Sequence, residues 1–307
     1  MFGGDWNESE ALEVYFPDED VAAMLTVLNI AHLKFEDVPG FNGLAFEELV
    51  NLAVLCDKYD VVHLVHPFLE WYDWARHYVY PEYVGPGYPA WLFIAWTFGY
   101  RHSFGLLARH LSLRVEVRDN IILLGNGYDV MASYMPQDIL ESILEVRKNT
   151  IAEMLKTCYD LVELALEGPV CQLKHTDRPA TEKSNCSSII LGSVLGQIKK
   201  LDLYPHPKGT QTIGSCVLDV MEHLGTVNPT PIYADDIEKA IKVASDHRRH
   251  SFGNALDLKE VLTSSERPHH LCTLSYIRYK EIGDIVHAMP SLVLSHHINH
   301  MNEQAKK

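Results

Sequence analysis

Apolar residues recur at helical spacing in three consecutive segments between Val21 and Tyr72. A repeat of three to four residues is typical of a helix that buries one face. Pro39-Gly40 and Asn42-Gly43 interrupt the pattern, and such pairs favour turns. We therefore expect three short amphipathic helices here. Their apolar faces are Val21, Leu25, Leu28 and His32; then Leu49, Leu52, Ala53 and Cys56 in a helix over about 45–59; then Val62, Val65, Leu69 and Tyr72, with Pro67 inside.

The remaining sequence is predicted to be mainly helical as well. Leu12, Val14 and Phe16 alternate with polar neighbours, the pattern of a short strand, and residues 114–124 alternate in the same way. The fold class is thus mainly α-helical with a small β component. Further helices are expected over 90–111, from about 137 to 168, over 188–203, 216–224 and 234–246, and from 275 to the end with a break at Pro290.

Acidic residues are concentrated at the start of the chain. Residues 1–70 hold fourteen carboxylates against Lys34 and Lys58, a net charge of −12, and the remaining residues contribute −3. Such a region repels nucleic-acid phosphates and attracts basic partners. Nucleic acid is therefore not an expected partner.

The six cysteines are scattered along 307 residues, which favours reduced thiols in the cytoplasm or nucleus over a disulfide framework. The N-terminus shows no signal-peptide pattern. The most apolar run, 90–98, is about half the length of a membrane-spanning helix. We expect an intracellular protein without a membrane partner.

The segment MFGGDWNES at residues 1–9, the strand at 13–16, Asp18-Glu19-Asp20 and the helix after them resemble the central part of BTB/POZ domains. Asn29 to Phe35, Val38-Pro39 and residues 52–60 are similar to fungal members of that family. Residues 90–111 resemble the helical extension behind such domains. Cys186, residues 191–195 and 203–205 resemble the C-terminal half of the same fungal proteins. The resemblance covers most of the chain, and its specificity comes from the order and spacing of the motifs.

This resemblance implies three parts: a partial BTB/POZ domain at 1–79, a linker at 80–89, and a helical C-terminal region at 90–307 with a loop near 169–187. The match begins partway into the family's fold, as if the front of the domain were missing. That front supplies most of the family's homodimer interface, so homodimerisation is not implied here. Its loss would leave apolar surface exposed near Phe2, Val14 and Leu28.

The resemblance further implies a protein-interaction module without catalytic activity. BTB domains that bind a cullin scaffold carry a large apolar residue, any residue, and then Glu, a pattern that Trp6-Asn7-Glu8 meets. An apolar anchor beside a polar group is the usual form of an interface hot spot. The alternative is that Trp6 covers the small sheet and Glu8 is solvated. A substrate adaptor of a cullin-based ubiquitin ligase is therefore one form of the expected function.

A zinc-binding regulatory protein is the alternative from another class. Its candidate ligands are Cys158, Cys171, His175 and Cys186, a donor set that zinc accepts. Structural zinc sites usually pair ligands two to four residues apart, and Cys171 with His175 comes nearest to that spacing. Three structural thiols and a surface histidine explain the same residues. Two histidine-rich clusters, His269-His270 with Cys272 and His296-His297 with His300, are more typical of solvated faces.

Motifs of catalysis are not found. The sequence lacks a Gly-x-Ser-x-Gly elbow, a P-loop and a dinucleotide-binding fingerprint, so no catalytic residue and no cofactor is expected apart from zinc. An aromatic cluster precedes the linker, and it packs either into the core or around a peptide groove. Its members are Trp71, Tyr72, Trp74, Tyr78 and Tyr80.

Overall fold

The computed structural model confirms a mainly helical chain with a small two-stranded sheet. It describes residues 13, 16, 18–41, 43–75, 88–124, 127–130, 134–167, 180–201, 203, 213–225 and 275–307. Contacts divide these residues into two compact units. The first holds those within 1–111, 126–143 and 291–307, and the second those within 112–125 and 144–290. The BTB/POZ architecture and the three-part division stay predictions.

The first unit begins with α1 (Val21–Ala31), whose start is set by its N-cap. The Asp20 carboxylate accepts a hydrogen bond from the Ala23 amide at 2.9 Å, which satisfies one of the unpaired amides of the first turn. A 3-10 turn, η2 (Phe35–Asp37), follows. The next helices are α2 (Phe46–Tyr59) and α3 (Val62–Trp71), which contains Pro67. All three helices expected in this part are confirmed.

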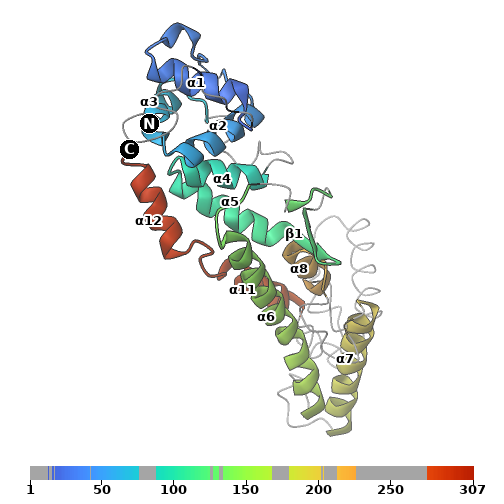
Figure 1. The fold of residues 1–307 in the computed structure, drawn as a ribbon. Coiled ribbons are helices and arrows are strands. Elements are labelled where there is room, and N and C mark those ends of the chain that lie inside the picture. Colours follow the sequence, from blue (N-terminus) through green and yellow to red (C-terminus); the bar gives the residue numbers. More distant parts are fainter. Residues whose placement is uncertain are drawn as a thin grey trace, which may run out of the picture. The chain divides into compact units, whose positions relative to one another are not determined.

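The α2 helix forms the centre of the first unit. It contacts α1, α3 and α4 (Tyr88–Thr97), as Figure 1 shows for the blue and turquoise helices. The apolar face expected for α2 is confirmed, because Leu49, Leu52, Ala53 and Cys56 are all fully buried. Burial raises the pKa of the Cys56 thiol to about 12, so this thiol stays protonated at neutral pH.

The single helix expected over 90–111 is instead two helices, α4 and α5 (Arg101–Arg114). The chain turns between them at Gly99, whose φ is +79°. Side chains disfavour this left-handed conformation, which glycine adopts freely. A β-carbon on Gly99 would also lie 2.8 Å from the Ala305 amide nitrogen and 2.8 Å from the Met301 carbonyl oxygen. The break therefore depends on a contact about 200 residues away in sequence, which the local pattern cannot reveal.

The C-terminal helix α12 (Ser295–Gln304) packs against α4. The His300 ring stacks on Trp96, with ring centroids 3.8 Å apart and planes 7° apart. The Lys307 ammonium pairs with the Asp60 carboxylate at the end of α2. The expected break near Pro290 is confirmed, since α11 (Ser275–His287) ends before it and α12 begins after it.

The second unit contains a hairpin of β1 (Val115–Arg118) and β2 (Ile121–Leu124), with Val115 opposite Leu124. The strand-like pattern of 114–124 is thus two strands. Asp119 and Asn120 make the turn at φ values of +50° and +65°, as a two-residue hairpin turn of type I′ requires.

The helices of the second unit are α6 (Ile139–Glu167), whose first residues belong to the first unit, α7 (Ala180–Lys200), α8 (Val217–Gly225) and α11. The expected bounds of α6 and α8 hold closely. By contrast, α7 begins at Ala180, whereas the sequence places its start at 188. The polar residues before 188 therefore extend the helix instead of forming a loop. The helix expected over 234–246 lies outside the described residues.

A helix that crosses a membrane must be long and strongly apolar. None of the helices within the described ranges meets both conditions.

We predict that Gly99→Ala destabilises the protein by about 2 kcal/mol or more, because it combines left-handed backbone strain with a backbone clash against α12. Urea unfolding measures the change. The matched control is Gly192→Ala in α7, where a β-carbon meets nothing within 4 Å and alanine favours the helix. Equal stabilities of the two variants would contradict this account of the α4–α5 break.

Candidate functional site

The α1 helix carries aliphatic residues on two opposite sides, but the first unit covers only one of them. Its sequence, VAAMLTVLNIA, holds no charged residue. The buried face carries Ala23, Thr26, Val27 and Ile30, which point to the core. The aliphatic side chains Val21, Leu25 and Leu28 lie on the opposite face and are 72%, 52% and 37% exposed. We call these three residues the α1 face.

The stripe predicted to be the buried face of this helix is therefore the exposed one, and Ala23, Thr26, Val27 and Ile30 opposite form the core contact. Exposure of Leu28 agrees with the surface expected there, while Phe2 and Val14 lie outside the described residues. A helix with aliphatic residues on opposite sides is normally buried on both sides in soluble proteins. The α1 face is thus a candidate contact surface.

Carboxylates stand at both ends of the α1 face. Asp18 is exposed just before the helix. Beyond its C-terminal end, the side-chain amide of Asn29 donates to the Asp37 carbonyl at 3.3 Å and the Lys34 amide donates to the Asn29 carbonyl at 2.8 Å. These bonds fold η2, with its exposed Glu36 and Asp37, back onto the end of α1.

Glu19 belongs to the same acidic end but is engaged within the unit. Its carboxylate accepts hydrogen bonds from the Lys58 ammonium and from the Tyr59 hydroxyl, the latter at 2.8 Å. These donors, Lys58 first, hold the Glu19 pKa below its usual value. One of the two lysines in this acidic region is therefore already paired.

The residues of the sequence-predicted cullin contact, Trp6 and Glu8, lie outside the described residues. That contact stays a prediction.

The predicted zinc ligands are only partly described. Cys158 on α6 and Cys186 on α7 are both buried, whereas Cys171 and His175 lie outside the described ranges. Among described side chains, no three His, Cys, Asp or Glu residues gather as a metal would need. The four-residue zinc set therefore stays a prediction.

The C-terminal histidine cluster has a structural role. His297 is 1% exposed, and its Nε2 lies 2.6 Å from the Gln137 carbonyl oxygen, so Nε2 carries the proton and donates. Its Nδ1 accepts from the Leu294 amide at 3.2 Å and so caps α12. Both nitrogens are occupied only in the neutral ring, and burial holds the His297 pKa below its usual value.

The aromatic cluster before the predicted linker divides between core and surface. Trp74 is fully buried, and its indole N–H donates to the Pro39 and Gly40 carbonyls at 3.2 and 3.1 Å. Trp71 is 70% exposed beside Phe68, with ring centroids 5.5 Å apart. Trp74 thus fits the prediction of core packing, whereas Trp71 is exposed, as a residue of a peptide groove would be. Tyr78 and Tyr80 lie outside the described residues.

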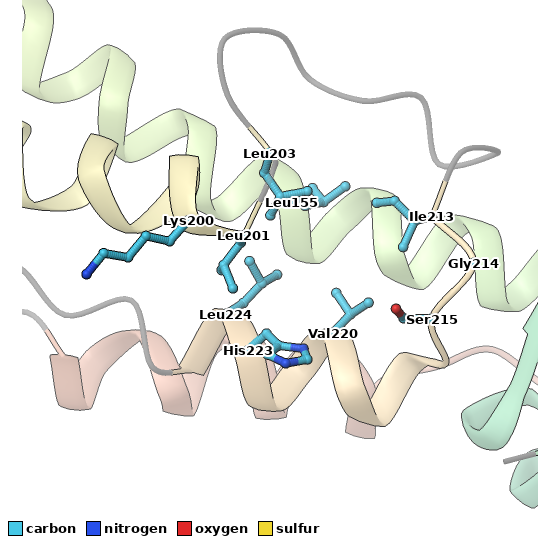
Figure 2. Close-up of a pocket in the computed structure, with 10 residues that line it drawn as sticks. All are labelled: Leu155, Lys200, Leu201, Leu203, Ile213, Gly214, Ser215, Val220, His223 and Leu224. Atoms are coloured by element: carbon cyan, nitrogen blue, oxygen red, sulfur yellow. The ribbon is translucent and has the colours of Figure 1, made fainter.

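A hollow of about 390 Å³ lies within the second unit (Figure 2). It is formed by α6, the end of α7, residues 213–215 and α8. Its wall is mixed, because polar atoms form about as much of the lining as aliphatic carbons, and Figure 2 shows Lys200 extending away from the other labelled side chains. The lining residues are Leu155, Lys200, Leu201, Leu203, Ile213, Gly214, Ser215, Val220, His223 and Leu224.

Arg147 on α6 positions the segment 213–215. Its guanidinium is 4% exposed and donates to the carbonyls of Ile213, Gly214 and Ser215 at 2.8, 3.2 and 2.7 Å. A further bond at 3.1 Å reaches the Val115 carbonyl in β1. A buried guanidinium is stable only when its donors are satisfied, so these bonds tie the segment to the hairpin and to α6.

Sequence reasoning did not single out Arg147. One signal was available, because Arg147 lies four residues after Ile143 on the buried stripe of α6, where an arginine needs partners. Its partners were not predictable, since they are backbone carbonyls of distant segments.

No family model, curated protein or solved structure matches this chain. The functional argument therefore depends on the residues themselves.

We predict that stability falls as the pH drops below about 6.5, the ordinary histidine pKa. In that range His297 binds a proton in the unfolded chain but stays neutral in the folded protein, which lowers the free energy of unfolding. This decrease ends once the pH falls below the depressed pKa of folded His297. Burial lowers the pKa of His300 too, so both act in the same direction. Urea midpoints at pH 7 and pH 5 measure the effect.

His297→Gln should lower stability at pH 7, because glutamine does not reproduce both hydrogen bonds of the ring. It should also reduce the additional loss of stability between pH 7 and pH 5, because glutamine does not titrate. The control is His32→Gln at an exposed site. An undiminished pH dependence in His297→Gln would show that His297 is not the sensitive group.

Proposed function

We propose that this chain is a non-enzymatic protein-interaction module of the BTB/POZ type, and that its α1 face binds a basic, amphipathic segment of a partner protein. The helices α1, α2 and α3 lie between Val21 and Trp71, in the part of the chain whose sequence resembles that family. The contact with a cullin through Trp6 and Glu8 would be a narrower form of this proposal.

The observation that carries the proposal is the exposure of the α1 face. Three large aliphatic side chains at helical spacing face solvent on a helix without any charge, and such contiguous apolar surface is characteristic of interaction sites. Removing aliphatic side chains from water contributes about 25 cal/mol per Å². A partner helix laid along α1 would gain this energy through anchors spaced three or four residues apart.

Charge indicates what kind of segment fits. The α1 helix is about 16 Å long at 1.5 Å per residue, and the α1 face covers about 10 Å of it. Exposed carboxylates stand at each end of it, Asp18 at one and Glu36 with Asp37 at the other, where Lys34 offsets one of the two charges. A matching segment is therefore apolar in its middle and carries lysine or arginine at both ends.

The test uses two synthetic amphipathic helices with identical leucine faces, one with lysines and one with glutamates at both ends. Fluorescence anisotropy with the full chain should show binding of the lysine peptide that weakens with salt, and at least about tenfold weaker binding of the glutamate peptide.

Leu25→Asp separates apolar docking from general attraction. This change adds negative charge, so unspecific attraction would strengthen binding of the lysine peptide, whereas docking on the α1 face predicts at least about tenfold weaker binding. The matched control is Leu164→Asp on α6, where the leucine is 57% exposed. Equal affinities of both variants, or of both peptides, would contradict the proposal.

A further inference from the structure

The hollow in the second unit is built before any ligand arrives, because each segment around it is fixed by hydrogen bonds. Arg147 holds 213–215, and the Val117 amide donates to the Gly214 carbonyl at 2.9 Å. The Tyr159 hydroxyl donates to the Leu203 carbonyl at 2.6 Å. At the start of α8, the Asp219 amide donates to the Cys216 sulfur at 3.4 Å. A preformed site spends little binding energy on ordering itself.

The walls of the hollow favour an aliphatic molecule. Its apolar lining consists of leucine, isoleucine and valine, and its polar lining includes Lys200, Ser215 and His223. A volume of about 390 Å³ is at the lower end for small-molecule sites. The site therefore suits a small, flexible hydrocarbon body.

One end of the hollow is positive. The Ser215 hydroxyl lies at this end (Figure 2), and the Arg147 guanidinium donates to the Ser215 carbonyl behind it. Carbonyl oxygens carry no formal charge, so these bonds leave the arginine's charge uncancelled. Glu116 acts on Arg147 electrostatically, but its own carboxylate pairs with Arg118. Ser215 is exposed, so solvent screens part of this charge, but a cation behind the serine still favours an anion there.

We propose that this hollow binds a small aliphatic monocarboxylate, with its hydrocarbon body against Leu155, Leu201 and Leu224 and its carboxylate at Ser215. The serine hydroxyl donates to the carboxylate, and Arg147 stabilises its charge through the field rather than by direct contact. This site is independent of the α1 face and adds a ligand to the proposed interaction module.

Isothermal titration of the full chain with octanoate, 1-octanol and acetate tests the ligand class without any mutation. Octanoate should bind with one-to-one stoichiometry. Octanol lacks the charge and should bind about tenfold more weakly, and acetate lacks the hydrocarbon body and should show no binding. Absence of octanoate binding, or equal affinities for octanoate and octanol, would overturn the proposal.

Two variants locate the site. Ile213→Phe adds bulk to the wall and should weaken octanoate binding at least about tenfold, whereas Ile189→Phe, at an isoleucine on α7 that is 41% exposed, should leave it unchanged. Ser215→Ala removes one hydrogen bond from an exposed side chain and should weaken octanoate about fivefold without affecting octanol. Unchanged octanoate affinity in folded Ile213→Phe or Ser215→Ala would place the ligand elsewhere and overturn the proposal.

Discussion

The burial of α2 is the constraint on which the first unit depends. Its residues Leu49, Leu52, Ala53 and Cys56 are inaccessible to solvent, with α1, α3 and α4 packed around the helix. The α1 helix meets this core through Ala23, Thr26, Val27 and Ile30 and leaves Val21, Leu25 and Leu28 outside. Close packing on one side therefore coincides with exposed leucine and valine on the other. The candidate interaction surface follows directly from how the core is filled.

A buried arginine has the corresponding role in the second unit. Arg147 satisfies carbonyl groups of β1 and of 213–215 at the same time, segments separated by about a hundred residues. Removing the guanidinium would leave the carbonyls of Val115, Ile213 and Ser215 without this donor, and a buried group left unpaired costs about 1–3 kcal/mol. The same bonds fix one wall of the hollow and bring positive charge behind it. Arg147 thus both holds 213–215 in place and favours an anionic ligand in the proposed site.

The α2 face and most helix positions could be predicted from sequence, because alternation of strongly apolar and polar residues is local information. The buried side of α1 could not, because both of its sides are apolar and only the partners α2 and α3 decide between them. The break at Gly99 depends on the backbone of Met301 and Ala305, and the fixing of 213–215 depends on Arg147. Long-range contacts of this kind leave little trace in a single sequence.

The central claim is that the α1 face contributes little to the stability of the fold and is available to a partner. Urea unfolding of Leu25→Ser and Val27→Ser, two substitutions on opposite sides of one helix, tests it directly. We predict that Leu25→Ser changes the free energy of unfolding by less than about 0.5 kcal/mol, whereas Val27→Ser lowers it by about 2 kcal/mol. A loss in Leu25→Ser as large as that in Val27→Ser would show that the α1 face belongs to the core and contradict the account.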